Sequence, residues 1–382
     1  MFNQLKSIFG GKEENLPLLK FVSGLYPDID LSNVVLIACQ HLLGTTYNLF
    51  EELFKKGLKP ENVFLIGKCY STNEKVYQKF VDRKVHISES SKAFDSTISF
   101  DEQFQGYIEV FLQKVKGTIN TKDFKKIIIL DDGGGLLLFA NDFFKDCSNF
   151  VGIEQTSSGY ERLKDVNLLF PVFNIARSKA KLEYESPMVA ELIVNKIEDY
   201  IKESHINNPK ILVVGQGYIG KGITQLLNQK YSVNGCDRIA DKCDFGGNYK
   251  SRLGEFDVIV GAAGVSVLAA GDFGKLKKGV VLISASSSDR EFSAVYLRRL
   301  EGKTDNCHKD FDVNDIELLN GGFPINFDGR EHSLSPEKIQ LTRALLLAGI
   351  YESLNANGRN GILELDNAVQ QQIIKKFSDI IK

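Results

Sequence analysis

The chain carries one glycine pattern that few folds accommodate. Four apolar residues, 211–214, predict a buried parallel strand, and Gly215, Gly217 and Gly220 follow with G-x-G-x-x-G spacing. An apolar pattern of helical period comes next, and a second strand ends near Asp237. A strand, a glycine turn, a helix and then an acid about twenty residues on are typical of a dinucleotide-binding βαβ unit.

Each part of this pattern has a physical task. The glycines let the backbone turn tightly and approach a pyrophosphate, and the helix N-terminus attracts its negative charge. Asp237 is placed to bind an adenosine ribose, which favours NAD, whereas the neighbouring Arg238 could accept the 2′-phosphate of NADP. We therefore expect NAD as the cofactor, with NADP left open. The expected contacts in the turn are Gly215, Gly217, Tyr218, Ile219 and Gly220.

Composition excludes several classes of protein. The net charge is −2 and no long basic run occurs, which argues against nucleic acid or an anionic membrane surface as partner. No apolar stretch is long enough to span a bilayer, and the N-terminus lacks the features of a signal peptide. Six cysteines without metal-ligand spacing predict reduced thiols and no metal site, so we expect a cytoplasmic protein.

Short apolar strands alternate with helices along the first half, which predicts a parallel sheet covered on both faces. The expected strands are 33–39, 62–67, 84–87, 126–130, 149–154 and 171–175, and the expected helices are 45–56 and 74–82.

A long helix from about 186 to 204, with Pro187 suited to its first turn, precedes the glycine motif. Beyond the motif we expect strands at 258–261, 279–284 and 316–319, then helices at 336–354 and from 364 onward. The predicted fold is α/β, with two Rossmann-like domains whose sheets are mostly parallel, the central one doubly wound. Residues 1–187, with 335–382 returning to them, would bind substrate, and 188–334 would bind NAD.

Several blocks outside the glycine motif carry more specific information. They are Ala38-Cys39-Gln40-His41 with Thr46, Tyr70-Ser71-Thr72, Leu130-Asp131-Asp132-Gly133-Gly134, the segment 152–159, the run Asn174, Ser178, Lys181 and Glu185, the extended turn GQGYIGKG, and Ala262-Ala263-Gly264 with Asn320. In this order, across roughly residues 30 to 350, they resemble the S-adenosyl-L-homocysteine hydrolase (adenosylhomocysteinase) family.

The resemblance implies a redox-assisted elimination. That family uses tightly held NAD to oxidise a ribose 3′-hydroxyl, eliminates the 5′ group, adds water and reduces the ketone again. By position, Lys181 would assist 3′-oxidation, which requires a lowered lysine pKa. Asp132 would be the base at C4′ and His41 would serve the 5′ group. Glu185 would hold the ribose hydroxyls, where the family has aspartate.

The resemblance also implies cofactor contacts by Ala263, Gly264 and Asn320. Residues Thr156, Ser157 and Ser158 would either contact the nicotinamide ribose or only cap a helix. Each catalytic candidate could also have a purely structural role. Asp132 can belong to a plain turn after a strand, His41 to a loop or core, and Lys181 to a solvated helix face.

The departures from the family pattern concern substrate binding. Ser287 and Phe327 stand where the family has histidines, Leu43 replaces a threonine, and Gln155 replaces a second glutamate. The C-terminal lysine and tyrosine that reach a neighbouring subunit's NAD have no counterpart. We therefore expect the family's mechanism on an altered nucleoside-type substrate, as part of one-carbon metabolism, in a homo-oligomer such as a dimer.

Two other classes of protein also fit the sequence. A 2-hydroxyacid dehydrogenase also has a late dinucleotide-binding domain, and would need Arg290, Glu291 and His332 as its arginine, acid and histidine. The second alternative is a non-catalytic regulatory protein that binds NAD, which the loss of both histidines favours.

Overall fold

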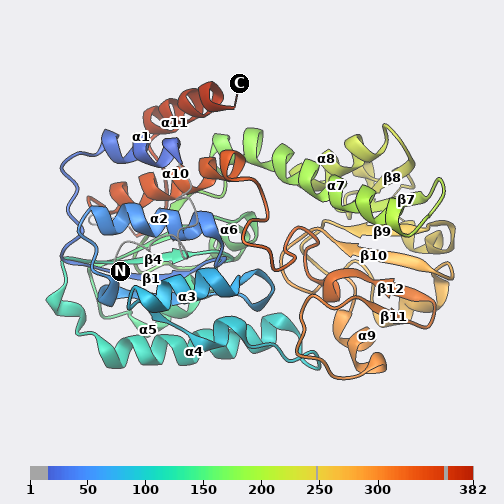
Figure 1. Cartoon of the computed structure of the whole chain (residues 1–382), viewed down its shortest axis with the longest axis horizontal. Coiled ribbons are helices and arrows are strands. Elements are labelled where there is room, and N and C mark those ends of the chain that lie inside the picture. Colours follow the sequence, from blue (N-terminus) through green and yellow to red (C-terminus); the bar gives the residue numbers. More distant parts are fainter. Residues whose placement is uncertain (1–15, 247, 357–359, 382) are drawn as a thin grey trace, which may run out of the picture.

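The computed structural model describes residues 16–246, 248–356 and 360–381 and contains two α/β units side by side (Figure 1). The first has a seven-stranded sheet of order β13-β6-β5-β4-β1-β2-β3, in which every pairing is parallel. The second has a six-stranded sheet of order β11-β12-β10-β9-β7-β8, parallel except between β11 and β12. The predicted fold class is confirmed.

The first sheet is buried on both faces because successive side chains of each strand alternate between two cores. In β1, Leu36 and Ala38 join the core under α1, α2, α10 and α11, whereas Ile37 and Cys39 join the core under α4 and α5. The strands are β1 (Val34–Cys39), β2 (Val63–Ile66), β3 (His86–Ile87), β4 (Lys126–Asp131), β5 (Phe150–Glu154), β6 (Pro171–Asn174) and β13 (Gly361–Glu364). The helices around them are α1 (Pro17–Leu25), α2 (Gly44–Lys55), α3 (Glu74–Asp82), α4 (Phe100–Thr118), α5 (Gly135–Phe143), α6 (Ser157–Leu163), α10 (Pro336–Ser353) and α11 (Asn367–Ile380).

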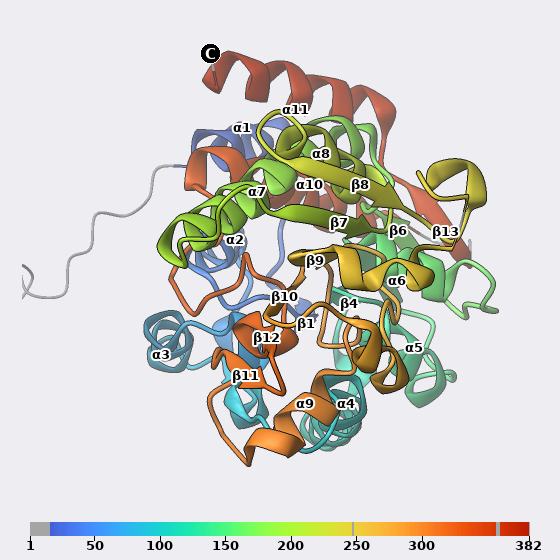
Figure 2. The same ribbon diagram turned by 90° about the vertical axis from the view of Figure 1, so that its right-hand side faces the viewer.

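The second sheet also has helices on both faces. In Figure 2 this unit faces the viewer, with α7 and α8 on one side of the sheet and α9 on the other. The apolar faces of α7 and α8 pack on β7, β9 and β10. Its elements are α7 (Ser186–Glu203), β7 (Lys210–Val214), α8 (Tyr218–Leu227), β8 (Ser232–Cys236), β9 (Val258–Gly261), β10 (Val280–Ser284), α9 (Ala294–Glu301), β11 (Phe311–Val313) and β12 (Ile316–Leu318).

One predicted boundary is wrong. The last helix does not begin at Glu364, because residues 361–364 form β13 and pair with β6 at the edge of the first sheet. Helix α11 begins at Asn367, where the carboxylate of Asp366 accepts hydrogen bonds from the amides of Ala368 (2.7 Å) and Val369 (3.0 Å). This side-chain cap satisfies amides that have no partner within the helix.

A buried ion pair of the second unit makes contact with the first unit. Arg298 of α9 is fully buried and donates to Asp289 Oδ2 at 2.7 Å and to the carbonyl of Gly321 at 2.9 Å. The same carboxylate accepts the amide of Phe100, at the start of α4 in the first unit, at 3.1 Å. The rings of Phe94 and Phe323 lie against the guanidinium, each with its centroid 5.0 Å away. The relative position of the units is thus held by hydrogen bonds that water does not reach.

We predict that Asp289→Ala lowers the free energy of unfolding by about 3–5 kcal/mol, because it leaves the buried Arg298 charge unpaired. Urea denaturation measures the change. The control is Glu74→Ala, which removes the partner of Lys92 in an exposed ion pair and should change the free energy far less. Equal losses in the two variants would contradict a special role for the buried pair.

Candidate active site

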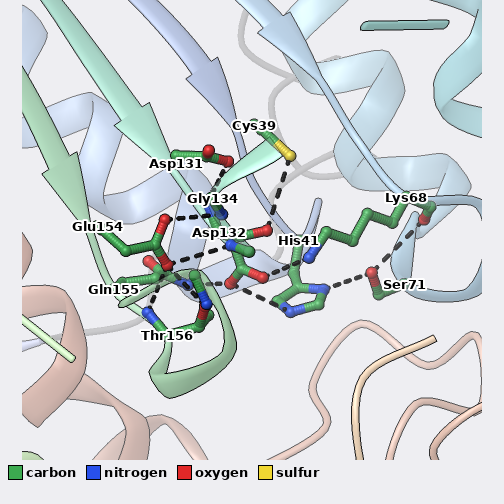
Figure 3. A network of polar contacts seen from close by, with 12 residues as sticks. Cys39, His41, Lys68, Ser71, Asp131, Asp132, Gly134, Glu154, Gln155 and Thr156 are labelled. Atoms are coloured by element: carbon green, nitrogen blue, oxygen red, sulfur yellow. Dashed lines mark hydrogen bonds and ion pairs between the residues drawn. The ribbon is translucent and has the colours of Figure 1, made fainter. Parts of the chain in front are cut away.

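The candidate site lies at the carboxyl edge of the first sheet, where parallel strands end together and ligands commonly bind. Four neighbouring strands of the sheet, β5, β4, β1 and β2, each contribute one residue that follows the strand. His41 follows β1, Lys68 follows β2, Asp132 follows β4 and Gln155 follows β5. Figure 3 shows their side chains converging on the carboxylate of Asp132.

Asp132 is 4% exposed, and both of its carboxylate oxygens are occupied. The Lys68 ammonium donates to Oδ1 and the Gln155 amide donates to Oδ2, while His41 Nε2 lies 3.3 Å from Oδ2. Burial alone would raise the pKa of this carboxyl, but the neighbouring His41 and the Lys68 ammonium hold it well below its usual range. Sequence reasoning missed Lys68, although its place just after a buried strand is the signal that pointed to Asp132.

Both ring nitrogens of His41 have polar partners, since its Nε2 faces Asp132. Its Nδ1 lies 2.5 Å from Ser71 Oγ, and its ring stacks on Phe327 with centroids 4.3 Å apart and planes inclined by 26°. Burial lowers the pKa of His41 to about 3 in spite of the opposing charge of Asp132. The imidazole is therefore neutral near pH 7, and it faces an aromatic ring where the resemblance implies a second histidine.

Lys181 and Glu185 lie on a π-helical turn, Lys181–Glu185, which runs into α7. The Lys181 ammonium is 3.1 Å from Glu185 Oε2 and donates to the carbonyl oxygen of Gln155 at 2.6 Å. Since the Gln155 side chain binds Asp132, the turn is connected to the rest of the network. The four residues predicted to be catalytic, His41, Asp132, Lys181 and Glu185, therefore belong to one continuous set of polar contacts.

The buried Glu154 binds two backbone segments that carry this network. Its carboxylate accepts the amides of Gly133 (3.2 Å) and Gly134 (2.9 Å) in the turn after β4, and the amide and hydroxyl of Thr156 at 2.7 and 2.6 Å. Burial, together with the charge of Asp131, raises the pKa of Glu154 to about 8. This arrangement holds the Asp132 turn against α6.

The three hydroxyl residues after Gln155 begin α6. Thr156 Oγ1 accepts the amide of Gly159 at 2.9 Å, so this side chain caps the helix, as one of the two interpretations expected. Ser157 is exposed and Ser158 is half-buried. The nicotinamide-ribose contact assigned to these residues stays a prediction.

The glycine turn has the geometry that a dinucleotide requires. Gly215 has φ +104°, and a Cβ atom there would lie 2.5 Å from the backbone of Ala262. A Cβ atom on Gly220 would lie 1.8 Å from the carbonyl oxygen of Gly215. Gly217 is the N-cap of α8 and has open space around it, and Tyr218 and Ile219 begin that helix. Only glycine fits the first and third positions.

Asp237 lies beside this turn. Its Oδ2 accepts the amide of Gln216, between the first two glycines, at 2.7 Å, and its Oδ1 accepts the amide of Ile239 at 3.2 Å. The carboxylate is thereby held next to the place where the adenosine ribose of a dinucleotide would lie. The turn and the acid fit NAD.

Other predicted cofactor residues already have partners. The amides of Ala263 and Gly264 donate to the buried carboxylate of Glu291 at 2.8 and 3.2 Å. The Asn320 amide donates to the carbonyls of Pro324 (2.9 Å) and Phe327 (2.8 Å), and its Oδ1 lies 2.8 Å from His308 Nδ1. In this structure these groups stabilise the loops around the site, and Ser287 is half-buried on one of those loops.

The expectation of six reduced cysteines is wrong for one pair. Cys236 and Cys243 form a disulfide that closes the loop containing Asp237, and the other four cysteines are free. No local pattern marks this pair, because six residues lie between the two cysteines and only the path of the loop after β8 brings them together. Within the described ranges, no group of three or more His, Cys, Asp or Glu residues could hold a metal ion.

Across the described part of the chain, no helix combines the length and the apolar character needed to cross a membrane.

Comparison with known proteins gives a likeness that extends over most of the chain. No family model matches the chain. It is 38% identical over 328 residues, 85% of its length, to an uncharacterized protein of Mycobacterium tuberculosis, present in strains H37Rv and CDC 1551. The chain spans 64% of the length of that relative. An adenosylhomocysteinase of Acinetobacter baylyi is 29% identical over 118 residues, which are 29% of this chain and 25% of that enzyme.

Among solved structures, the chain is similar to NAD-linked and related proteins at low identity. A dipicolinate synthase chain of Bacillus halodurans is 9% identical with a TM-score of 0.38, over 86% of this chain and 99% of that one. An NAD-bound 3-phosphoglycerate dehydrogenase of Entamoeba histolytica is 10% identical with a TM-score of 0.38, over 91% and 96%. At these TM-scores the likeness is too weak to transfer an activity.

The buried His41 makes stability depend on pH. Its folded pKa of about 3 lies below the ordinary unfolded value of about 6.5, so between these values the unfolded chain binds a proton that the folded chain excludes. Stability is therefore lost as the pH falls from about 6.5. We predict that His41→Gln makes urea-derived stability less steep between about pH 6.5 and 4.5, by up to about 1.4 kcal/mol per pH unit. If the plots of stability against pH have the same slope in both chains, His41 is protonated as easily in the folded chain as in the unfolded chain.

The glycine turn gives a second prediction. Gly220→Ala should weaken NAD binding about tenfold or more, because the new methyl group overlaps the Gly215 carbonyl and overpacking costs about 1–3 kcal/mol. Isothermal titration calorimetry measures the affinity. Gly106→Ala is the control, since a Cβ atom there meets nothing within 4 Å. Unchanged affinity in Gly220→Ala would exclude this turn as the NAD site.

Proposed function

We propose that the chain is an NAD-dependent enzyme of the adenosylhomocysteinase type. It would oxidise the 3′-hydroxyl of a nucleoside ribose so that the 5′ group can be eliminated and replaced by water. The observation that carries the proposal is the network that contains His41, Asp132, Lys181 and Glu185. These residues were chosen from three separate sequence blocks, and they lie in one polar cluster. The partial likeness to the Acinetobacter baylyi enzyme supports the same assignment.

NAD, when bound, would supply the oxidising power for the ribose carbon. The glycine turn would hold its pyrophosphate at the start of α8, and Asp237 would bind the adenosine ribose. The chain's own contribution is to position the substrate ribose and to move protons to and from it.

Lys181 is proposed to take the proton of the 3′-hydroxyl. In this structure its Nζ is an ammonium 3.1 Å from Glu185, so the proposal requires that Lys181 lose a proton before the substrate is oxidised. The ammonium that then forms again is stabilised by the same carboxylate. Glu185 can also accept a hydrogen bond from the ribose hydroxyls. Because the same Nζ donates to the Gln155 carbonyl, its direction is fixed by the backbone after β5.

Asp132 and His41 are proposed to act on the two ends of the eliminated bond. Asp132 takes the proton from C4′, and this proton passes from Asp132 to His41 Nε2, which lies 3.3 Å from Oδ2, and then to the leaving group at C5′. In this structure Asp132 is a weak base, since Lys68, Gln155 and His41 all face its oxygens. The proposal therefore requires that substrate take the place of one of these partners at Oδ2, which would raise the basicity of the carboxylate.

The two alternatives have different support. A 2-hydroxyacid dehydrogenase would need Arg290, Glu291 and His332 around one substrate, but the three have separate surroundings. Arg290 pairs with an aspartate of α4 at 2.8 Å, Glu291 binds the loop after β9, and His332 lies against Gly44 of α2. A non-catalytic NAD-binding protein is favoured by the stacking of Phe327 on His41. The oligomeric state and the cytoplasmic location remain predictions.

The test is reduction of NAD by the bound nucleoside. Adding adenosine to the NAD-loaded chain should produce the absorbance of reduced nicotinamide, and Lys181→Met should abolish it because the proton acceptor is lost. Lys179→Met is the matched control, since Lys179 is exposed two residues away. The non-catalytic alternative predicts no signal in any variant. A signal that persists with 3′-deoxyadenosine would contradict oxidation at the 3′ position.

A further inference from the structure

A buried arginine in this site has no counter-charge. Arg343 of α10 is 3% exposed. Its Nε donates to Thr45 Oγ1 at 3.4 Å, and among the described residues no carboxylate lies within ion-pair distance of its guanidinium. A guanidinium carries five donors, and burial of its charge without a carboxylate partner costs several kcal/mol. The fold therefore maintains an unpaired positive charge in its interior.

The position of this charge connects it with the network. The carboxylates of Asp132 and Glu185 act on the guanidinium from beyond contact distance, and its positive charge in turn acts on His41. Lys68 is paired with Asp132 and Lys181 with Glu185. Of these three cations, Arg343 alone has no carboxylate within ion-pair distance in the described part of the chain.

Two further features indicate that a ligand completes the site. Arg343 contacts Thr45 in the first turn of α2, where the positive end of the helix dipole adds to the attraction for an anion. Gln40 is fully buried and both polar atoms of its side chain lack partners within the described structure, as does Oε1 of Gln155. Buried polar groups are normally hydrogen-bonded, so unpaired atoms at a strand edge suggest a bound polar molecule.

We propose that Arg343 binds an oxyanion on the 5′ substituent of the substrate, so that the substrate class is a nucleoside with a carboxylate or phosphate at that end. The 5′ end is chosen because Thr45, the contact of Arg343, lies four residues after His41, to which the proposed function assigns the 5′ group. Arg343 binds the carboxylate or phosphate through its planar donors, which match two oxygens of either group. The nucleoside part of this proposal rests on the proposed function, whereas the anion site does not depend on it.

Isothermal titration calorimetry of the NAD-loaded full chain tests this proposal with three nucleosides. They are adenosine, adenosine 5′-monophosphate and adenosine-5′-carboxylic acid, and the last two distinguish phosphate from carboxylate. We expect at least one anionic nucleoside to bind about tenfold or more tightly than adenosine. Arg343→Gln should abolish this preference, and Arg343→Lys should keep part of it because a point charge remains. Arg162→Gln, on the partly exposed Arg162 of α6, should behave as the unchanged chain.

Thermal unfolding separates binding from a structural role. Without ligand, Arg343→Gln should unfold at the same or a higher temperature, because an unpaired buried charge has been removed. Inorganic phosphate should raise the unfolding temperature of the unchanged chain and of Arg162→Gln, but not of Arg343→Gln. A lower unfolding temperature in ligand-free Arg343→Gln would indicate a structural residue and overturn the proposal.

The remaining outcomes are also decisive. If the unchanged chain binds anionic and neutral nucleosides alike, or if Arg343→Gln keeps the preference, the proposal is wrong. If no nucleoside binds while phosphate still stabilises the chain through Arg343, the anion site stands and the nucleoside function fails. If neither nucleosides nor phosphate bind, both are overturned.

Discussion

The buried carboxylate of Asp132 is the interaction on which the candidate site depends. A carboxylate at this depth is stable only when donors occupy it, and here the donors come from the loops after three other strands. His41, Lys68 and Gln155 are therefore held by one charge, and the edge of the sheet becomes a rigid polar surface. The same donors weaken Asp132 as a base. The chemistry that we propose must accordingly begin with a change of partners at this carboxylate.

The second constraint is the joint between the two units. Arg298, Asp289 and the amide of Phe100 form a buried bridge from α9 to α4. A second link runs from Asn320 through the carbonyl of Phe327 to the ring of His41. Asn320, which the resemblance implies for the cofactor, thus holds in this structure the loop that carries Phe327. Phe327 places an apolar ring over His41 at the position where the resemblance implies a histidine, and this fits the altered substrate that we propose.

Much of the secondary structure was predictable because buried parallel strands are short apolar runs. Residues 126–130 and 211–214 were predicted as strands and form the greater part of β4 and β7. The strand β13 was missed since its apolar residues, 362–363, are few and find their partner only in β6, far away in sequence. Helix α4 was also missed, although Phe104, Ile108 and Phe111 follow a helical period and are buried. Its interruption by charged residues hid that period.

The site was predictable only in part for a similar reason. The glycine spacing of residues 215–220 is a local property, because the turn needs a positive φ and the absence of Cβ atoms within six residues. The catalytic candidates came from ordered blocks, and their contacts with one another are long-range. Lys68 and Arg343 belong to no motif, and the pairing of Cys236 with Cys243 depends on the path of one loop.

The sequence by itself determined the alternation of strands and helices, the glycine turn and the identity of the chemical groups, because these follow from local periodicity and side-chain chemistry. The tertiary structure alone decided which charges share one buried volume. Pairing of a charge depends on distances between segments up to about three hundred residues apart, such as Thr45 and Arg343, and no local pattern encodes those distances. That is why the sequence could nominate Asp132 and Lys181, while only the fold revealed that Lys68 neutralises one carboxylate and that Arg343 is left without any.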